Sequence, residues 1–273
     1  MRVLVTGSTD GIGKETVTRL ASMGYNVVVH GRSSSRVGRT VERIREDYPE
    51  VACNGIIADL SSLKEVKRMA DELIHRELVP DVLINNAGVI EKEFNLSADG
   101  YEVTFAVNHL AHFYLTLLLL EYLPENARII NVSSMIHSPS IDISKLNDEK
   151  GFDGIEAYSH SKLCNILFTY KLHRILNGDR NITVNALHPG VINTKVLINS
   201  WGPIGAPVKE GAETPVYLAV SSDVTNVSGA YFNDKRKVNS TPVSYDEHLQ
   251  DECWTRSLEM IKDAGFDVPD SAL

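Results

Sequence analysis

The amino-terminal segment constrains the fold more than any other part of the chain. A β-branched run over residues 2–6 leads into the turn Gly7-x-x-x-Gly11-x-Gly13, which is typical of a strand that ends in a tight loop. A helical pattern then closes at Gly24, and a second β-branched run covers residues 26–30. Strand, glycine-rich turn, helix and strand form the first unit of a dinucleotide-binding fold, in which the pyrophosphate lies at the helix N-terminus. The alternative is a tight turn that needs glycine for conformation alone.

The rest of the chain repeats this alternation. Further strands are expected at 51–58, 81–85, 127–132 and 181–187, and helices at about 35–48, from Ser62, at about 98–123, and over the segment that carries Tyr158 and Lys162. Continuous apolar strands separated by helices predict a parallel sheet covered on both faces. We therefore expect an α/β protein, a single Rossmann domain over residues 1–273, with a doubly wound parallel sheet of about seven strands. An amphipathic helix at about 244–264 is expected to begin at the capping box Ser244–Glu247.

Composition narrows the functional classes. A hydrophobic fraction of 43% and a charged fraction of 23% are ordinary for a soluble globular protein, and the net charge of −9 argues against nucleic acid or an anionic membrane surface as partner. Cys53, Cys164 and Cys253 are far apart, so we expect no disulfide framework, no metal site and a reducing, cytoplasmic location. We expect no signal peptide and no membrane span, because polar residues interrupt the apolar run 107–123.

Tyr158 and Lys162 are the strongest candidates for chemistry. Four residues apart on a helix, they lie on one face with attachment points about 6 Å apart. A phenol with a pKa of about 10 is a poor acid or base at neutral pH, but a nearby cation favours its phenolate and lowers that pKa. The pair therefore predicts a proton donor and acceptor for a carbonyl or alcohol. The alternative is a chance pair on a solvated helix face.

Several motifs in one order give the chain a family resemblance. It resembles the short-chain dehydrogenases/reductases over about residues 1–232, and within them the retinol dehydrogenase and WW-domain oxidoreductase-like branch. The motifs that carry the resemblance are Thr6-Gly-x-x-x-Gly-Ile-Gly13, Asn85-Asn-Ala-Gly88, Asn108-His-Leu-Ala-His-Phe113, Ser134, Tyr158-Ser-His-Ser-Lys162 and Pro189-Gly190.

The resemblance implies four catalytic roles. Tyr158 exchanges the proton with the substrate oxygen, and Lys162 lowers the Tyr158 pKa and holds the nicotinamide ribose. Ser134 hydrogen-bonds the substrate oxygen, and Asn108 holds a water in a proton relay to Lys162. Cofactor binding is implied for Gly7, Ser8, Gly11, Ile12, Gly13, Arg32, Ser33, Asp59, Leu60, Asn86, Ala87, Gly88, Tyr158, Lys162, Pro189, Gly190, Val191 and Thr194.

The end of the second strand bears on the choice of cofactor. NAD-dependent members have an acidic residue there for the ribose 2′-hydroxyl, whereas this chain has Gly31 followed by Arg32 and Ser33. A guanidinium with flanking hydroxyls suits a 2′-phosphate, although Asp10 in the glycine loop is unfavourable to it. We expect NADP(H) to be preferred, with NAD(H) as the alternative.

These observations predict an NADP(H)-dependent oxidoreductase that reduces an aldehyde or ketone, or runs in reverse. The alternatives are a retinoid or steroid dehydrogenase and a non-catalytic NADP(H)-binding sensor or scaffold. Residues 138–154 and 192–211 are expected to border the substrate cleft. Apolar helix surface around residues 163–170 predicts a homodimer or homotetramer.

Overall fold

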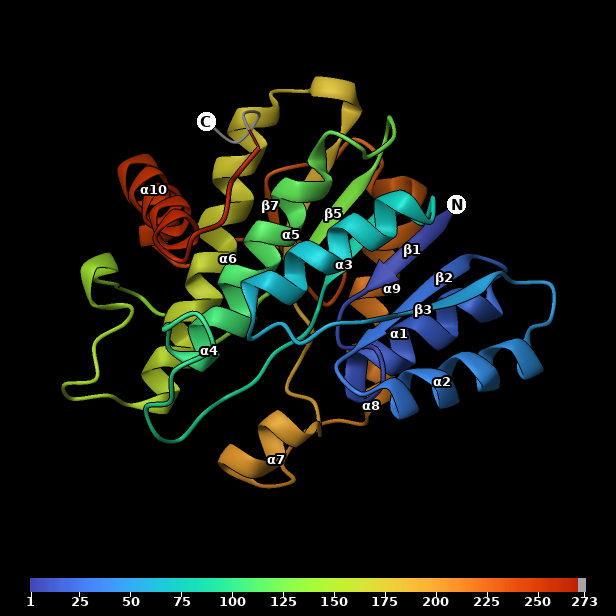
Figure 1. The fold of residues 1–273 in the computed structure, drawn as a ribbon, viewed down its shortest axis with the longest axis horizontal. Coiled ribbons are helices and arrows are strands. Elements are labelled where there is room, and N and C mark those ends of the chain that lie inside the picture. The colour runs from blue at the N-terminus through green and yellow to red at the C-terminus, as the bar shows by residue number, and fades with distance from the viewer. Residues whose placement is uncertain (270–273) are drawn as a thin grey trace.

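One eight-stranded sheet forms the centre of the molecule (Figure 1). The computed structural model describes residues 1–269 apart from the side chain of Trp201, so residues 270–273 of the expected domain lie outside the described residues. The strand order is β3-β2-β1-β4-β5-β6-β7-β8. The strands are β1 (Arg2–Val5), β2 (Asn26–Gly31), β3 (Cys53–Ile57), β4 (Val82–Asn85), β5 (Arg128–Val132), β6 (Thr183–His188), β7 (Ala230–Asn233) and β8 (Arg236–Val238).

The predicted doubly wound parallel sheet is confirmed. Neighbouring strands from β3 to β7 pair in parallel, and the eighth strand, β8, is a short antiparallel addition next to β7. The order reverses direction at β1, which pairs with β2 on one side and β4 on the other. Folds of this kind bind ligands beside such a reversal, at the carboxyl ends of the strands.

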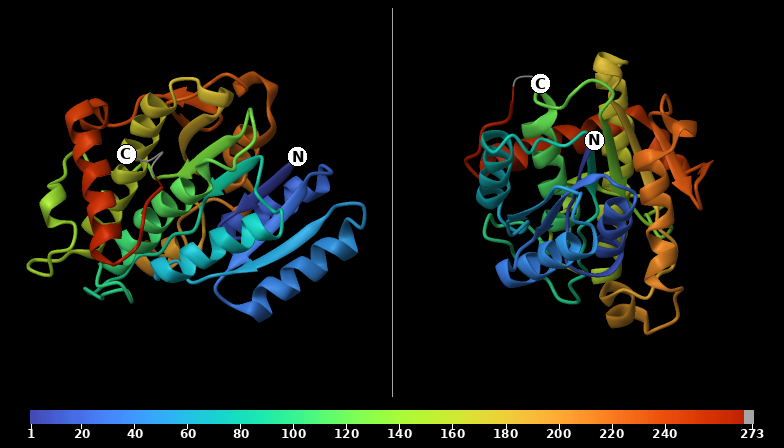
Figure 2. Two further views of the ribbon diagram at one scale, coloured as in Figure 1. Left: turned by 45° about the horizontal axis from the view of Figure 1, so that its top comes forward. Right: turned by 90° about the vertical axis from the view of Figure 1, so that its right-hand side faces the viewer.

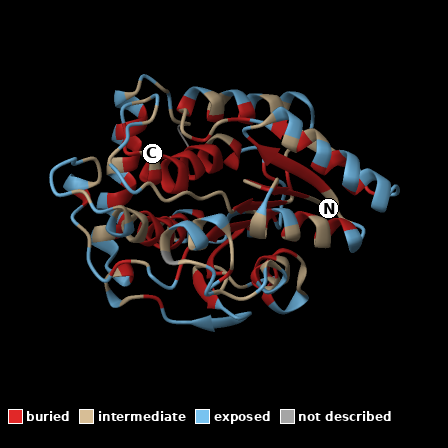
Figure 3. Cartoon of the chain, turned by 90° about the horizontal axis from the view of Figure 1, so that it is seen from below, coloured by how far each residue is buried: buried red, intermediate tan, exposed pale blue. Residues whose placement is uncertain are grey.

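Helices cover both faces of the sheet. The helices are α1 (Gly11–Ser22), α2 (Ser34–Asp47), α3 (Leu63–His75), α4 (Val103–Phe105), α5 (Ala111–Leu120), α6 (Gly154–Leu176), α7 (Lys195–Trp201), α8 (Val208–Gly211), α9 (Glu213–Val220) and α10 (Glu247–Asp263). One core cluster joins α3, α5, α6 and α10 to the sheet, and a second joins α1, α2 and α9 to its opposite face. Figure 3 shows the inner helices and most strands largely buried, whereas β8 is exposed and the connecting segments are mostly exposed or intermediate.

The helix expected at 98–123 begins later than predicted and is not regular. Glu102 ends the preceding turn, and its carboxylate accepts hydrogen bonds from the N–H groups of Thr104 and Phe105, both at 2.7 Å. A π-helical segment, Ala106–Leu110, then separates α4 from α5. The span Val103–Leu120 is long and apolar enough to cross a membrane, but 89% of it is buried inside the fold, as a core helix would be.

The carboxy-terminal helix α10 starts at Glu247, and its N-cap lies two residues after the predicted cap Ser244. Asp246 is its N-cap, accepting from the N–H groups of His248 and Leu249. Ser244 lies in a preceding 3₁₀ turn, where its buried hydroxyl donates to the Thr241 carbonyl at 2.6 Å. The expected Ser244 cap is therefore wrong, because the 3₁₀ turn Pro242–Tyr245 places Ser244 before the helix, and its oxygen contacts the Ser240 hydroxyl at 2.6 Å.

Helix α10 lies alongside α6, as the views in Figure 2 show, and both belong to the same hydrophobic core cluster. Trp254 packs edge-on against Phe113 with ring centroids 4.9 Å apart and lies 5.9 Å from Phe168. The apolar side chains of α6 that suggested a subunit contact are buried within a single chain. The homo-oligomer stays a prediction, but this argument no longer supports it.

We expect Trp254→Ala to lower the free energy of unfolding by about 3–5 kcal/mol, because it leaves a cavity between α5, α6 and α10. Tyr122→Ala is the matched control, since the Tyr122 side chain is 54% exposed and should change stability little. Urea denaturation of the two variants measures the difference. Equal stabilities would show that α10 contributes no packing energy to the fold.

Candidate active site

The four residues predicted to be catalytic meet at the carboxyl ends of β4 and β5 and the first turns of α6. The Ser134 hydroxyl hydrogen-bonds the Tyr158 phenol, and the Lys162 ammonium lies over the Tyr158 ring, 5.4 Å from its centroid. A Cβ built on Gly88 would be 3.5 Å from both the Asn108 Oδ1 and the Lys162 Nζ atoms. Residues from four separate segments therefore border one small volume.

Hydrogen bonds hold both the side chain and the main chain of Lys162. Its side chain is buried, and Nζ donates to the main-chain oxygen of Val132 at 3.1 Å. The Lys162 main-chain oxygen accepts from the Ser133 hydroxyl at 2.7 Å. Strand alternation in the sequence gave no signal of this contact. Burial lowers the pKa of Lys162 to about 8, because a desolvated ammonium is disfavoured.

The acidity of Tyr158 differs from the sequence expectation in the ligand-free protein. Burial raises the pKa of Tyr158 to about 12, and the hydrogen bond with Ser134 lowers it only in part. Lys162 lies against the ring face, and the hydrogen bond with Ser134 is the one contact that lowers the pKa of Tyr158. The sequence analysis expected Lys162 to lower the Tyr158 pKa. That expectation is wrong for the ligand-free protein, in which Tyr158 keeps its proton at neutral pH.

The Asn108 amide is buried in an apolar segment and therefore needs hydrogen-bond partners, which the structure provides. It lies in the π-helical segment, where its Oδ1 accepts from the Val89 N–H at 2.8 Å. Its Nδ2 donates to the Val89 carbonyl and to the Ser161 hydroxyl, both at 3.0 Å. The side chain thus ties the loop after β4 to α6.

Thr6 and His112 form a connection that the sequence analysis missed. The Thr6 hydroxyl accepts from the N–H groups of Asn86 and Ala87 at 2.8 and 3.0 Å, so its hydrogen points to the His112 Nε2, 2.8 Å away. His112 Nδ1 then donates to the Asn108 carbonyl at 3.0 Å. This neutral histidine joins the glycine loop, the loop after β4 and α5.

His137 fixes the main chain of Ser134. The Thr241 N–H donates to His137 Nε2 at 2.9 Å, so Nδ1 carries the hydrogen and donates to the Ser134 carbonyl at 2.6 Å. The Tyr231 hydroxyl donates to the same carbonyl at 3.1 Å. His137 therefore has a structural hydrogen-bonding role.

The glycine loop has the shape of a phosphate cradle. Gly7 and Gly11 have φ of +64° and +52°, which favours glycine. A Cβ on Gly13 would lie 2.5 Å from Asn86 Nδ2 and 2.6 Å from the Gly7 carbonyl. Ile12 and Gly13 occupy the first turn of α1, and N–H groups in a first turn have no intrahelical partner. These residues fit a dinucleotide pyrophosphate.

The remaining cofactor candidates surround this loop. Asp59 accepts from the Ser61 N–H and hydroxyl, and Leu60 and Ser8 are buried. Thr194 caps α7, and its methyl group would lie 3.5 Å from a Cβ on Gly11. Gly190, with φ of +99°, follows Pro189 and precedes Val191, which is exposed.

Charged residues gather beside the glycine loop. Arg32 is exposed and Ser33 is the N-cap residue of α2. Asp10 pairs with Arg36 at 2.8 Å and with Lys195 of α7 at 2.7 Å. These pairs offset the charge of Asp10, which the sequence analysis had counted against a phosphate.

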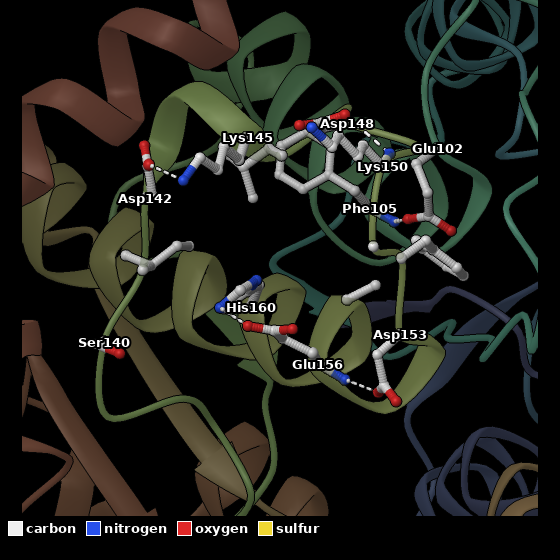
Figure 4. A pocket seen from close by; sticks show the side chains of 15 residues that line it. Glu102, Phe105, Ser140, Asp142, Lys145, Asp148, Lys150, Asp153, Glu156 and His160 are labelled. Carbon is white, nitrogen blue, oxygen red and sulfur yellow. Dashed lines mark hydrogen bonds and ion pairs between the residues drawn. The ribbon is translucent and has the colours of Figure 1, made fainter.

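Two cavities lie away from Tyr158. One of about 430 Å³ is bordered by α6, α4 and the segment 140–153, with Glu156 and His160 pointing into it (Figure 4). The other, of about 570 Å³, lies between the 3₁₀ turn Ile143–Lys145 and α10. Residues 140–153 thus border a hollow whose lining does not include Ser134, Tyr158 or Lys162.

Fold and site together define a dinucleotide-binding enzyme architecture, and comparison with known proteins specifies the family. The short chain dehydrogenase family model matches residues 1–202. The chain is 37% identical to retinol dehydrogenase 14 of Homo sapiens over 95% of this chain and 85% of that protein. The chain belongs to the short-chain dehydrogenase family and is an oxidoreductase of the kind that includes the retinol dehydrogenases.

Solved structures agree with this assignment. An uncharacterized protein from Mycobacterium paratuberculosis has a TM-score of 0.81 and 28% identity, covering 98% of this chain and 94% of that one. The structure of landomycin C-6 ketoreductase LanV with bound NADP and rabelomycin has a TM-score of 0.67 and 27% identity, covering 85% of this chain and 94% of that one.

Buried neutral histidines around the site predict acid sensitivity. Burial lowers the pKa of His30 and His188 to about 4 and that of His112 to about 3. The unfolded chain takes up protons below about pH 6.5 while the folded chain does not. Stability is therefore full above about pH 6.5 and is lost as the pH falls toward 4, by about 2 kcal/mol per histidine at about pH 5.

Urea denaturation at about pH 7 and about pH 5 measures this loss. His188→Gln should reduce the pH dependence, because an amide oxygen can still accept from the Met135 N–H that His188 Nδ1 binds at 3.1 Å. The exposed His248 is the control position, where the same substitution should change nothing. A free energy of unfolding that is equal at both pH values would contradict the assignment of neutral, buried histidines.

Proposed function

We propose that the protein catalyses NADP(H)-dependent hydride transfer between nicotinamide and a carbonyl or alcohol, with Tyr158 as general acid and base. The observation that carries the proposal is the arrangement of Ser134, Tyr158 and Lys162, in which the phenol is hydrogen-bonded by the serine and faced by the ammonium. A non-catalytic NADP(H)-binding protein has no need to bury an ammonium against a tyrosine ring.

Each residue has a defined task in this proposal. A bound nicotinamide supplies or accepts the hydride. Tyr158, protonated at neutral pH because burial raises its pKa to about 12, donates its proton to the carbonyl oxygen in reduction. The Ser134 hydroxyl hydrogen-bonds and orients the same oxygen. Lys162 uses one N–H on Val132 and has two others that suit ribose hydroxyls.

Asn108 has a different task from the water-holding role that the resemblance implies. Its Oδ1 and Nδ2 are engaged by Val89 and Ser161. Its main-chain oxygen accepts from His112 Nδ1 and from Asn165 Nδ2, each at 3.0 Å. We assign Asn108 to holding the loop after β4 against α6, and a water relay through its main-chain oxygen would have to compete with these two donors.

The substrate class follows from the relatives rather than from the cleft. The name of one relative specifies retinol, and the ketoreductase has bound rabelomycin. We place aldehydes, ketones and their alcohols first. A retinoid or similar long-chain allylic alcohol is the second candidate, favoured by the 37% identity to retinol dehydrogenase 14. A screen of NADPH consumption and NADP⁺ reduction over both classes decides between them.

We expect Tyr158→Phe to lower turnover by about 100- to 10,000-fold, the usual range for loss of a general acid. NADPH affinity should change little, because the ring and its packing stay. Lys162→Ala should lose turnover and also bind NADPH more weakly. Stopped-flow turnover and fluorescence titration of NADPH separate the two effects, and a Tyr158→Phe protein that turns over at the parent rate would exclude this mechanism.

We expect NADPH to bind more tightly than NADH, because Arg32 offers a fork of donors at the end of β2. The NADP bound to the related ketoreductase supports this preference. Arg32→Ala should weaken NADPH binding by about 10- to 100-fold, the value of a charge-assisted hydrogen bond, and leave NADH unchanged.

Arg39→Ala is the control, because Arg39 is exposed on the same helix, α2, away from its N-terminus. Equal dissociation constants for NADPH and NADH in the parent protein would contradict the proposed preference for NADP(H).

A further inference from the structure

One carboxylate in the glycine loop joins three elements beside the expected cofactor site. Asp10 caps α1 through Oδ1, which accepts from the Gly11 N–H at 3.0 Å. Its other oxygen, Oδ2, pairs with Arg36 of α2 at 2.8 Å and with Lys195 of α7 at 2.7 Å. The hydride transfer proposed above gives none of these three charged side chains a task.

The three charges lie at the corner where the end of β2 meets the glycine loop. A Cβ built on Gly31, at the end of β2, would be 2.8 Å from the Thr9 methyl group, so the loop residue before Asp10 lies directly against that strand end. In dinucleotide-binding folds this strand end faces the ribose 2′ position. Thr9 also leaves little room at Gly31 for the acidic side chain that would bind a 2′-hydroxyl. Asp10 and its two cations therefore border the expected position of the 2′ substituent.

Arg36 and Lys195 are accessible to a ligand. Their side chains are 41% and 74% exposed, and in the part of the chain that the structure describes each has Asp10 as its one ion-pair partner. Exposed ion pairs of this kind contribute little stability. Both cations can therefore exchange Asp10 for another anion without a change of fold.

A phosphate is a better partner for these cations than the Asp10 carboxylate. Both cations contact the same carboxylate oxygen, Oδ2, whereas a phosphate monoester offers three terminal oxygens and a charge of about −2. A guanidinium can bind two such oxygens at once. The hydrogen bond from Lys195 is the main cause that lowers the pKa of Asp10, so Asp10 is ionised at neutral pH. It therefore binds both cations in the free protein and competes with a phosphate for them.

We propose that Asp10 sets the cofactor specificity of this protein as an internal competitor of the 2′-phosphate. In the free protein its carboxylate pairs with Arg36 and Lys195, and NADP(H) binds by drawing both cations from Asp10 to the phosphate. NADH has no such phosphate and leaves the pairs intact. This role of Asp10 rests on the proposed use of NADP(H), but it has a consequence of its own, because neutralising Asp10 then strengthens the binding of NADPH selectively.

The test compares Asp10→Asn with the parent protein by fluorescence titration of the full chain with NADPH and with NADH. Asparagine is as good an N-cap as aspartate, so α1 keeps its cap while the competing charge is removed. The ratio of the NADH to the NADPH dissociation constant should rise by about 3- to 10-fold, the value of two exposed ion pairs. Any general gain from removing a negative charge near the pyrophosphate cancels in this ratio. Asp10→Ser, a second neutral cap, should give the same rise.

Glu15→Gln is the matched control. It removes the same charge from the same helix, but the Glu15 carboxylate pairs with Arg19 at 2.8 Å rather than with Arg36 or Lys195. The ratio of dissociation constants should therefore keep its parent value. Salt at about 1 M should reduce the effect of Asp10→Asn, because the Debye length then falls to about 3 Å.

Arg36→Ala, made in the parent and in the Asp10→Asn protein, tests the competition directly. It should weaken NADPH binding more in the Asp10→Asn protein, where Arg36 has no competing carboxylate, than in the parent. An equal loss in both proteins would overturn the proposal.

The sign of the Asp10→Asn effect separates the possible roles of Asp10. A ratio of dissociation constants that falls would show that Asp10 positions the cations for the phosphate, and an unchanged ratio would show that it does not act on them; either result would overturn the competitor role. Equal affinities for NADPH and NADH in the parent count instead against the proposed cofactor. A parent that prefers NADPH, with an unchanged ratio in Asp10→Asn, contradicts the competitor role alone.

Discussion

The burial of the Lys162 ammonium is the constraint on which the rest of the site depends. A buried charge is costly unless it is hydrogen-bonded, and Nζ reaches the Val132 carbonyl at the end of β5. The Ser133 hydroxyl then binds the main-chain oxygen of the same lysine. Because side chain and main chain of one residue are both tied to β5, the start of α6 has a single position relative to the strand, and Tyr158 is placed one turn before it.

A network of buried polar groups extends this position to the cofactor side. Asn165 donates to the Val132 and Asn108 carbonyls at 3.4 and 3.0 Å, and His112 joins the Asn108 carbonyl to Thr6 at the start of the glycine loop. Each member has the donor or acceptor that its neighbour needs, which makes such networks rigid. Because the network is rigid, it cannot rearrange to accept an added proton. A site that is ordered by neutral histidines is therefore stable only at pH values at which those histidines stay neutral.

Local sequence patterns predicted the sheet and the residues of the candidate site. The hydrogen bonds that hold the site depend on contacts between segments that are distant in sequence. The strand pattern, the glycine loop and the spacing of Tyr158 and Lys162 each depend on a few consecutive residues, so the sheet and the meeting of the candidate residues could be predicted. Thr6 contacts His112 across 106 positions, and Ser133 contacts Lys162 across 29; nothing in the chain's periodicity indicates such pairs. The amphipathic pattern predicted the helix α10, but for the same reason it did not indicate that this helix packs on α6.

Asp10 shows how pairing changes the electrostatics that composition suggests. Taken alone, a carboxylate in the glycine loop repels a phosphate. In the fold it caps α1 through the Gly11 N–H at 3.0 Å and pairs with Arg36 and Lys195, and the hydrogen bond from Lys195 is the main reason that its pKa is lowered. Arg32 lies four residues before Arg36 in the sequence. Beside the glycine loop, the three cations Arg32, Arg36 and Lys195 therefore accompany the carboxylate of Asp10. Since the side chains of the Asp10–Lys195 pair are 50% and 74% exposed, the pair contributes little, and these cations can turn to another anion at small cost.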